Sequence, residues 1–237
     1  MKSDKKIAIL QSNYIPWKGY FDLLNKVDEF IYYDHVQYTK NDWRNRNKIK
    51  TNKGIQWLTI PVRIESLSQA IMDTLVASSN WSRKHWTAIS NNYSKAKYFS
   101  DYKERFESLY LRLDTQYLCE INYEFIKVIC EILDIKTKFN WSTKFKLSEG
   151  KTERLVDICK QAKATCYITG PSAINYIDKN LFEQEGIKVE FMDYSNYPEY
   201  KQLYPPFVHE VSILDLIFNA GPHATRFMKS FSLAGKK

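Results

Sequence analysis

Residues 7–33 read IAILQSNYIPWKGYFDLLNKVDEFIYY, and this stretch decides the fold class. Ile7 to Leu10 is a short apolar run typical of a buried strand, Gly19 to Val27 has apolar residues at helical spacing, and Glu29 to Tyr33 is rich in residues that favour strands. The order strand, helix, strand predicts a βαβ unit. We therefore expect an α/β protein with a parallel or mixed sheet and a Rossmann-like, nucleotidyltransferase-like start.

A polar and aromatic loop separates the first strand from the helix. It reads Gln11-Ser12-Asn13-Tyr14-Ile15-Pro16-Trp17-Lys18-Gly19-Tyr20. Parallel sheets usually bind ligands at such loops, because the carboxyl ends of their strands open on one edge. Amphipathic aromatic rings suit the faces of sugars and bases, although most such rings fill cores. The substrate-binding residues expected here are Gln11, Asn13, Tyr14, Trp17 and Tyr20.

The rest of the sequence predicts further strands at both ends of the chain and an inserted helical layer between them. Strands are expected at Gln56 to Val62, Ile71 to Val76, Thr165 to Thr169 and Ile187 to Tyr194. Helices are expected at Arg83 to Ala96, Tyr102 to Leu113, Glu120 to Leu133, Thr152 to Lys163 and Ala173 to Glu185, with a C-terminal helix opened by Ser212. The 237 residues then divide into a βαβ-type half with a basic segment (1–80), a helical layer (81–147) and a second α/β half (148–237), expected to form one compact domain.

Residues 33–50 hold the densest group of charged, amide and aromatic side chains. If Arg44 to Lys50 is extended, then Arg44, Arg46, Lys48 and Lys50 project from one face, since side chains alternate along a strand. Such a face suits a nucleotide-sugar pyrophosphate, ATP or nucleic acid, because the arginine fork matches phosphate. The alternative is an edge strand whose Lys and Arg residues prevent aggregation. The substrate-binding residues expected from this segment are Gln37, Arg44, Asn45, Arg46 and Lys48.

Asp34 and His35 come directly after the second predicted strand. A carboxylate or an imidazole at this edge of the sheet could accept a proton from an attacking amine or hydroxyl. We take both as candidate catalytic residues. The alternative for each is a structural hydrogen bond or a cap.

The turn Thr169-Gly170-Pro171-Ser172 lies between a predicted strand and a predicted helix. Its backbone N–H groups and hydroxyl would stand at a helix N-terminus, where a phosphate or carboxylate binds readily. Gly170 and Ser172 are therefore candidate substrate-binding residues. The same residues also make ordinary turns of this kind.

The net charge is +8 and the pI is near 9.1, which fits a phosphorylated substrate, nucleic acid or an anionic membrane surface. The acids Glu29, Asp34 and Asp42 flank the cations of the basic segment, which favours a small phosphorylated ligand over a long polyanion. The sequence has no apolar run of about 20 residues and no signal-peptide core at its start, so we expect a cytoplasmic protein with no membrane span.

The histidines do not follow a known metal-binding pattern. His85 lies beside Trp86 in a predicted helix, and His209 and His223 flank the C-terminal helix. Neither spacing matches HExxH or a zinc finger, so we assign no metal. The sequence also lacks GxSxG, Walker and GxGxxG motifs, which argues against serine-hydrolase, P-loop and classical dinucleotide chemistry.

Several segments together resemble the WbqC-like family, and they extend over nearly the whole chain. They are Gln11 to Phe21, Asp34 to Tyr38, Trp43 to Lys50, Trp57 to Val62, Tyr93 to Ala96, Arg154-Leu155, Ile168 to Ser172, Tyr200 to Leu203 and Ser212 to Gly221. Members of this family are similar to proteins encoded with O-antigen and other polysaccharide genes. The resemblance implies a transferase or ligase that adds glycine or another small acyl group to an amino-sugar of cell-surface polysaccharide.

A looser analogy concerns the position of Pro16 to Tyr20. This loop occupies the place of the HxGH signature of nucleotidyltransferase-like α/β proteins, but both histidines are absent. Because those histidines stabilise the leaving phosphates, Trp17 and Tyr20 could not take their role. The fold can be shared where the chemistry is not.

The acceptor expected for such an enzyme is a phosphorylated small molecule such as a nucleotide sugar. The acyl donor could be activated by ATP, by a thioester or as an aminoacyl-tRNA, and ATP is the candidate cofactor. Two other functions are open: a nucleic-acid-binding module that recognises tRNA, suggested by Lys and Arg interleaved with Trp and Asn, and a non-catalytic scaffold of a polysaccharide assembly complex.

Overall fold

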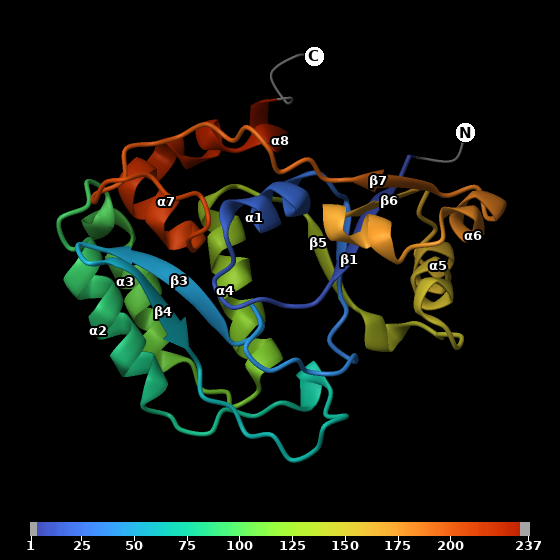
Figure 1. The fold of residues 1–237 in the computed structure, drawn as a ribbon, viewed down its shortest axis with the longest axis horizontal. Helices are drawn as coiled ribbons and strands as arrows, with labels where there is room; N and C mark the ends of the chain where they lie inside the picture. The colour runs from blue at the N-terminus through green and yellow to red at the C-terminus, as the bar shows by residue number, and fades with distance from the viewer. Residues whose placement is uncertain (1–3, 233–237) are drawn as a thin grey trace.

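A parallel sheet forms the centre of the computed structural model, which describes residues 4–232 (Figure 1). Within these residues the sheet has five strands in the order β5-β2-β1-β6-β7, and all neighbours are parallel. The strands are β1 (Lys6–Leu10), β2 (Glu29–Tyr32), β5 (Lys138–Trp141), β6 (Cys166–Thr169) and β7 (Lys188–Phe191). The predicted α/β class, with a βαβ start, is confirmed.

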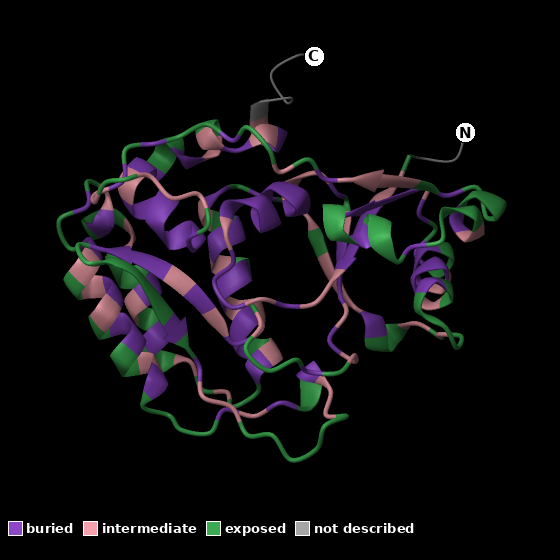
Figure 2. Ribbon diagram, in the orientation of Figure 1, coloured by how far each residue is buried: buried purple, intermediate pink, exposed green. Residues whose placement is uncertain are grey.

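Helices cover both faces of this sheet, because the side chains of its strands alternate between two cores. On β1, Ala8 packs into a large core with α1, α4 and α7, whereas Ile7 and Ile9 pack into a second core with α5 and α6. Figure 2 shows buried residues in β1 and along α1 and α7, whereas the edge strands β5 and β7 are half-buried or exposed. The helices are α1 (Lys18–Asn25), α2 (Trp81–Tyr93), α3 (Phe99–Arg112), α4 (Leu118–Ile132), α5 (Lys151–Gln161), α6 (Lys179–Gln184), α7 (Ile213–Ala220) and α8 (Lys229–Ser232).

Beside the sheet, β3 (Arg46–Thr51) and β4 (Gly54–Thr59) pair as an antiparallel hairpin. The extended conformation predicted for the basic segment is thus confirmed from Arg46 onward. The hairpin is fastened to the helical layer, since the Lys50 N–H donates to the Tyr93 hydroxyl of α2 at 3.0 Å. The Ser212 N–H, at the start of α7, donates to the Lys48 carbonyl at 2.8 Å.

Two predicted elements differ in the structure. The strand expected at Ile71 to Val76 is wrong: Ile71–Asp73 is a 3-10 helix (η1), which the Thr74 hydroxyl closes by donating to the Ala70 carbonyl at 2.9 Å. The helix expected at Ala173 to Glu185 is interrupted between the 3-10 helix η3 (Pro171–Asn175) and α6, because Asp178 starts a new helix by accepting from the Asn180 N–H at 3.0 Å. A short apolar run such as Ile71 to Val76 does not by itself distinguish a strand from a helix.

The order of the strands fixes where a ligand can bind. From β1 the chain adds β2 and β5 on one side of the sheet, and it then returns to add β6 and β7 on the other. The direction therefore reverses between β1 and β6, and the crevice outside the carboxyl ends of strands at such a reversal is the usual ligand site of open α/β sheets. None of the helices within residues 4–232 is long and apolar enough to cross a membrane.

Candidate functional site

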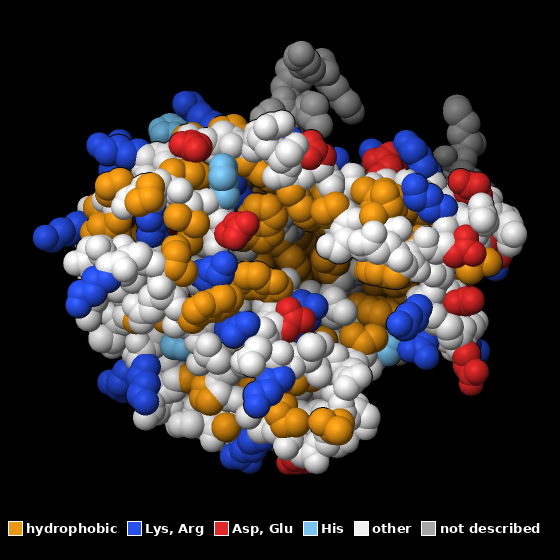
Figure 3. Space-filling model, viewed as in Figure 1, with side chains coloured by type: hydrophobic (Ala, Val, Ile, Leu, Met, Phe, Trp, Pro, Cys, Tyr) orange, Lys and Arg blue, Asp and Glu red, His pale blue; other side chains and the backbone are white. Residues whose placement is uncertain are grey.

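A pocket of about 550 Å³ opens at the carboxyl edge of the sheet. Two of its walls come from the loops that follow β1 and β7, and the others come from the start of the hairpin and from the segment before α7. Figure 3 shows this face of the molecule hollowed near its centre, with hydrophobic side chains on the walls and charged side chains around the rim. The lining residues are Asn13, Pro16, Trp17, Trp43, Asn47, Tyr194, Asn196, Tyr197, His209 and Glu210.

The loop after β1 is held in an unusual conformation by Asn47 of the hairpin. Ile15 has φ +36°, in the left-handed region that a β-branched residue rarely adopts. The Asn47 amide donates to the carbonyls of Tyr14 and Ile15 at 3.0 and 2.9 Å, and the Ile213 N–H donates to the Pro16 carbonyl at 2.9 Å. Backbone strain of this kind persists only where neighbours fix it, and it concentrates at functional sites.

The apolar wall of the pocket is built around Trp17. Its indole meets Tyr194 and Tyr197 edge to face, with ring centres 5.1 and 5.8 Å apart. The indole also lies over Gly19, where a Cβ would come within 2.3 Å of the Trp17 ring. Glycine at position 19 therefore permits the ring to lie in the wall.

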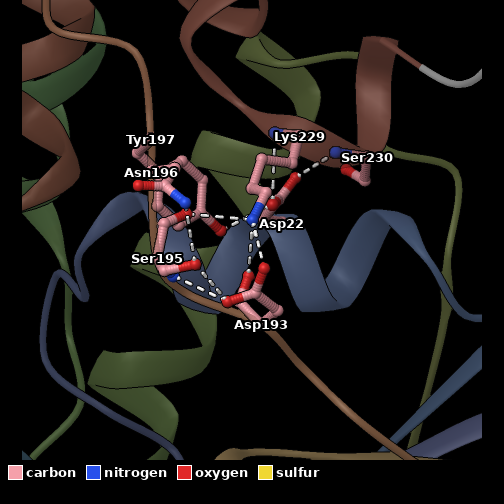
Figure 4. A network of polar contacts seen from close by, with 7 residues as sticks. All are labelled: Asp22, Asp193, Ser195, Asn196, Tyr197, Lys229 and Ser230. Carbon is pink, nitrogen blue, oxygen red and sulfur yellow. Dashed lines mark hydrogen bonds and ion pairs between the residues drawn. The ribbon is translucent and has the colours of Figure 1, made fainter.

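A polar network fastens the segment after β7 to α1 and α8 (Figure 4). The Lys229 ammonium donates to the Asp193 carboxylate at 2.8 Å and to the carbonyls of Asp193 and Ser195 at 3.1 and 2.9 Å. The Tyr197 hydroxyl donates to the Asp22 carboxylate at 2.6 Å, and the Ser230 N–H donates to the same carboxylate at 2.7 Å. These contacts fix the wall that Tyr194 and Tyr197 form.

Behind this wall lies a buried cation, Lys18, which is 3% exposed. Its ammonium donates to the Pro198 carbonyl at 3.1 Å and lies over the rings of Tyr197 and Phe207, 4.8 and 5.9 Å from their centres. Burial lowers the pKa of Lys18 to about 8, although Asp22 and Glu199 oppose the shift.

His209 brings an imidazole to the pocket. Its ring meets Phe207 edge to face at 4.6 Å, and its Nδ1 is shielded from solvent without a hydrogen-bond partner among the described residues. Burial and the nearby Lys18 charge lower the pKa of His209, and Glu199 and Glu210 oppose them. The imidazole is therefore mainly neutral at pH 7 and can accept a proton.

The basic hairpin stands at the mouth of the pocket. The Lys48 ammonium is 3.8 Å from the Glu210 carboxylate and 5.5 Å from the centre of the Trp43 ring, and both of these residues line the pocket. Trp57 lies 5.6 Å from Trp43, and the Arg46 guanidinium lies over the Trp57 ring at 4.3 Å. Lys50 does not join this surface, because it is buried and donates to the Gln202 side chain at 2.7 Å.

Arg44 and Asp34 hold the loop after β1 in place through hydrogen bonds. The Arg44 guanidinium donates to the Asn13 side-chain oxygen and to Gln11 Oε1, the latter at 3.2 Å, and it lies 3.5 Å from the Asp42 carboxylate. The buried Asp34 carboxylate accepts from the Ser12 N–H at 2.8 Å. Burial raises the pKa of Asp34 to about 6, against the opposing effects of the Ser12 hydrogen bonds and of Arg44.

His35 points to a different neighbourhood. Its Nδ1 is 2.6 Å from the Ser142 hydroxyl, and its ring meets Tyr33 edge to face at 4.5 Å. Burial and the Arg154 charge lower its pKa. Neither Asp34 nor His35 is among the residues that line the pocket.

The structure brings some of the predicted substrate-binding residues to the pocket and places others elsewhere. Asn13 and Trp17 line it. Arg44 donates to the side chains of both Asn13 and Gln11, and Arg46 and Lys48 stand at the mouth of the pocket. Gln37 is exposed and donates to the Leu67 carbonyl, and Gly170 and Ser172 lie outside the lining, at the start of η3. The buried residues among them are Tyr14, Tyr20 and Asn45.

Tyr14 and Tyr20 lie in the core, so neither ring offers a face to a ligand. The Tyr14 hydroxyl is 2.8 Å from His85 Nδ1 and 2.7 Å from the Tyr110 hydroxyl, and the Tyr20 hydroxyl donates to the Gln11 carbonyl at 3.1 Å. Amphipathic rings suit ligands and cores alike. The sequence pattern of the loop does not show which ring takes which place.

Sequence reasoning missed the pocket residues that follow β7 and precede α7. Tyr194 ends a predicted strand, and Asn196 and Tyr197 follow it, so the rule that places such loops on one edge could have found them. His209 and Glu210 come from an irregular segment with no such signal. Within residues 4–232, no group of three or more His, Cys, Asp and Glu side chains is placed to hold a metal ion.

Comparison with known proteins relates the chain to one family. The sequence model of the WbqC-like protein family matches residues 11–227. A protein of Mycobacterium tuberculosis (strain ATCC 25618 / H37Rv), described as "Uncharacterized protein Rv1507c", is 46% identical over 226 residues, which cover 95% of this chain and 98% of that protein. No solved structure matches the chain.

Proposed function

The chain belongs to the WbqC-like protein family, and we propose that it is an acyl or aminoacyl transferase, or an ATP-dependent amide ligase, that acts on an amino-sugar. It adds glycine or another small acyl group to a nucleotide-linked amino-sugar used for cell-surface polysaccharide of the O-antigen type. The work takes place in the cytoplasm, where nucleotide sugars are available. ATP is the candidate cofactor if the enzyme activates the acyl group itself.

The observation that carries this proposal is the pocket at the reversal between β1 and β6. Its volume, about 550 Å³, falls within the range of small-molecule sites, and its walls combine aromatic rings with a few amides and charged groups. Lys48 and Arg46 stand at the mouth, where they can neutralise a diphosphate. Trp43 and Trp57 lie beside these cations, and the exposed parts of their rings can pack on a base or a sugar.

Asp34 and Arg44 then act on substrate through the loop they support. Asp34 fixes Ser12, and Arg44 fixes Asn13, so both set the position of the loop that forms one wall. In this proposal they are positioning residues. His35 has no assigned contact with the ligand.

Thermal unfolding with UDP-sugars, ATP and glycine tests the proposal, because a ligand that binds the folded state raises the melting temperature. We expect a UDP-sugar to raise it, and the Trp43→Ala variant to lose most of that response while keeping its own unliganded melting temperature. The matched control is Tyr176→Ala, since Tyr176 is 59% exposed, against 42% for Trp43, and lies outside the pocket lining. No response of the wild type to any UDP-sugar would contradict the proposal.

A second candidate function rests on the same tryptophans. Exposed rings beside Arg and Lys are also how single-stranded nucleic acids are bound, with bases stacked on the rings and phosphates on the cations. A tRNA-binding module would therefore use the outer face of the hairpin and leave the pocket empty. It would respond to RNA and not to UDP-sugars.

A further inference from the structure

We infer that the pocket receives the amine-bearing sugar ring of the acceptor while the phosphates stay outside at the hairpin, and that His209 takes the proton released when the amine is acylated. This inference rests on the proposed function and names the substrate group and the base within the same site.

The charges of the pocket favour an amine over a phosphate. Among the described residues that line it, Glu210 alone carries a full formal charge at neutral pH, and that charge is negative. A diphosphate in the pocket would face this carboxylate, whereas an ammonium group would pair with it. Glu210 is exposed and lies 3.8 Å from the Lys48 ammonium, so a phosphate that binds Lys48 would leave the carboxylate to the ammonium. The cations Arg46 and Lys48 lie at the mouth, so the phosphates find their partners there.

The polar groups of the interior suit sugar hydroxyls. Arg44 donates to the side-chain oxygen of Asn13, which leaves the Asn13 amide N–H groups to face elsewhere. No described residue accepts a hydrogen bond from them, and Asn13 lines the pocket. A hydroxyl of the sugar can accept there while its ring packs on Trp17 and Tyr194.

His209 has the place and the protonation state that the reaction needs. It neighbours Glu210 in sequence, both line the pocket, and no described residue hydrogen-bonds either nitrogen of its ring. Because the Glu210 carboxylate is close enough to act on the pKa of His209, we place an amine held at Glu210 near this imidazole. The charged groups near it are Lys18, Glu199 and Glu210, with Lys48 beyond Glu210.

With an activated acyl ester as the donor, the ammonium group held at Glu210 first loses one proton to solvent water and becomes a neutral amine. The amine nitrogen attacks the acyl carbon, a C–N bond forms, and the nitrogen becomes positively charged. His209 takes a proton from this nitrogen, and the bond to the leaving group then breaks with its electron pair. The products are the amide, the released leaving group and a protonated imidazole that later gives its proton to water.

The test compares UDP-glucosamine with UDP-N-acetylglucosamine, which differ only in whether the amine is capped. We expect UDP-glucosamine to bind about tenfold tighter, as one charge-assisted hydrogen bond would provide, and Glu210→Gln to remove this preference.

In the NMR titration of the wild type, UDP-glucosamine should move the pKa of the His209 imidazole down by about one unit, because a nearby ammonium disfavours the protonated ring. The capped sugar should move it less. A His209→Gln spectrum assigns the signal. His223→Gln is the control, and it should leave the affinities for both UDP-sugars unchanged.

The outcomes separate the two claims. If neither UDP-sugar binds, the proposed function fails and this inference fails with it. If both bind equally, Glu210→Gln changes nothing and the His209 signal titrates as in the free protein, then the proposed function stands and only the inference is overturned.

Discussion

Gly19 has no side chain, and the indole of Trp17 occupies the space that a side chain would fill. A Cβ at position 19 would lie 2.3 Å from the ring, so the Gly19→Ala variant must turn the ring out of the pocket wall. Alanine normally stabilises a helix relative to glycine by up to about 1 kcal/mol. Here we expect the opposite sign: a lower melting temperature and UDP-sugar binding weakened by roughly tenfold or more, as for loss of an aromatic anchor.

The matched control for this variant is Gly170→Ala. A Cβ at Gly170 meets nothing within 4 Å, and its φ of −70° suits alanine. We expect its affinity and melting temperature to match those of the wild type. Equal behaviour of the two alanine variants would show that the position of Trp17 does not matter for binding.

Asp34 should make stability depend on pH. Burial raises its pKa from 3.8 to about 6, so its protonated form favours the fold. That contribution is complete below about pH 4 and is lost as the pH rises through about 6. Asparagine keeps an oxygen for the Ser12 N–H and does not titrate. Between pH 4 and pH 7 the free energy of unfolding of Asp34→Asn should therefore rise relative to that of the wild type by up to about 3 kcal/mol. Urea unfolding of both proteins at several pH values measures this difference, and a constant difference would contradict it.

At the scale of elements, the sequence was informative where periodicity was strong. The strand at Ile7 to Leu10 and the helices of the middle block were predicted to within a few residues, because their apolar spacing is long or their boundaries are marked. Neither β5 nor the 3-10 helix at Ile71–Asp73 was predicted. β5 is four residues long, and its place beside β2 depends on pairing that no local pattern shows.

The same limit applies to the candidate site. Asn13 and Trp17 could be predicted because they follow the first strand, and the topology rule places that loop at the ligand edge. Tyr14 could not be told from Trp17, since only the packing against His85 and Tyr110 puts it in the core. His209 was visible in the sequence, but nothing local connects it to a pocket formed by residues nearly 200 positions earlier.

The segment after β7 should depend on its fastening by Lys229. The Lys229→Met variant keeps the aliphatic stem but loses the ion pair with Asp193 and the bonds to two carbonyls. Because the Asp193 carboxylate is largely exposed, the ion pair is screened by solvent and we expect little change in melting temperature. Ligand affinity should fall, since the wall that carries Tyr194 and Tyr197 becomes free to move.

The control for Lys229 is Lys188→Met on β7. Lys188 also forms an exposed ion pair, 2.6 Å from Glu190, but it does not contact the pocket segment. Thermal unfolding and titration with a UDP-sugar should find both variants equally stable and only Lys229→Met weakened in binding. Equal affinities would show that the segment keeps its position without Lys229.

For the whole molecule, the strand order matters more than the net charge. A charge of +8 fits several partners, but the reversal between β1 and β6 gathers two loops, the hairpin and the segment before α7 around one pocket. The basic surface of Arg46 and Lys48 is short and ends at Glu210. This arrangement suits a ligand whose charge is confined to a diphosphate.

The double variant Arg46→Ala/Lys48→Ala distinguishes a small diphosphate ligand from a nucleic acid. We expect it to bind a UDP-sugar at least about tenfold more weakly, because charge-assisted hydrogen bonds to phosphate are each worth roughly 1.5–3 kcal/mol. Arg83→Ala/Lys84→Ala is the matched control, since it removes the same two residue types from exposed positions of α2 and lowers the net charge equally.

Titrations with the UDP-sugar and with single-stranded RNA at two salt concentrations compare both variants with the wild type. A small ligand should show a shallow salt dependence that only the first variant alters. Tight RNA binding that falls steeply with salt, together with no response to the UDP-sugar, would instead favour the nucleic-acid module, because a protein that neutralises many phosphates releases many counterions.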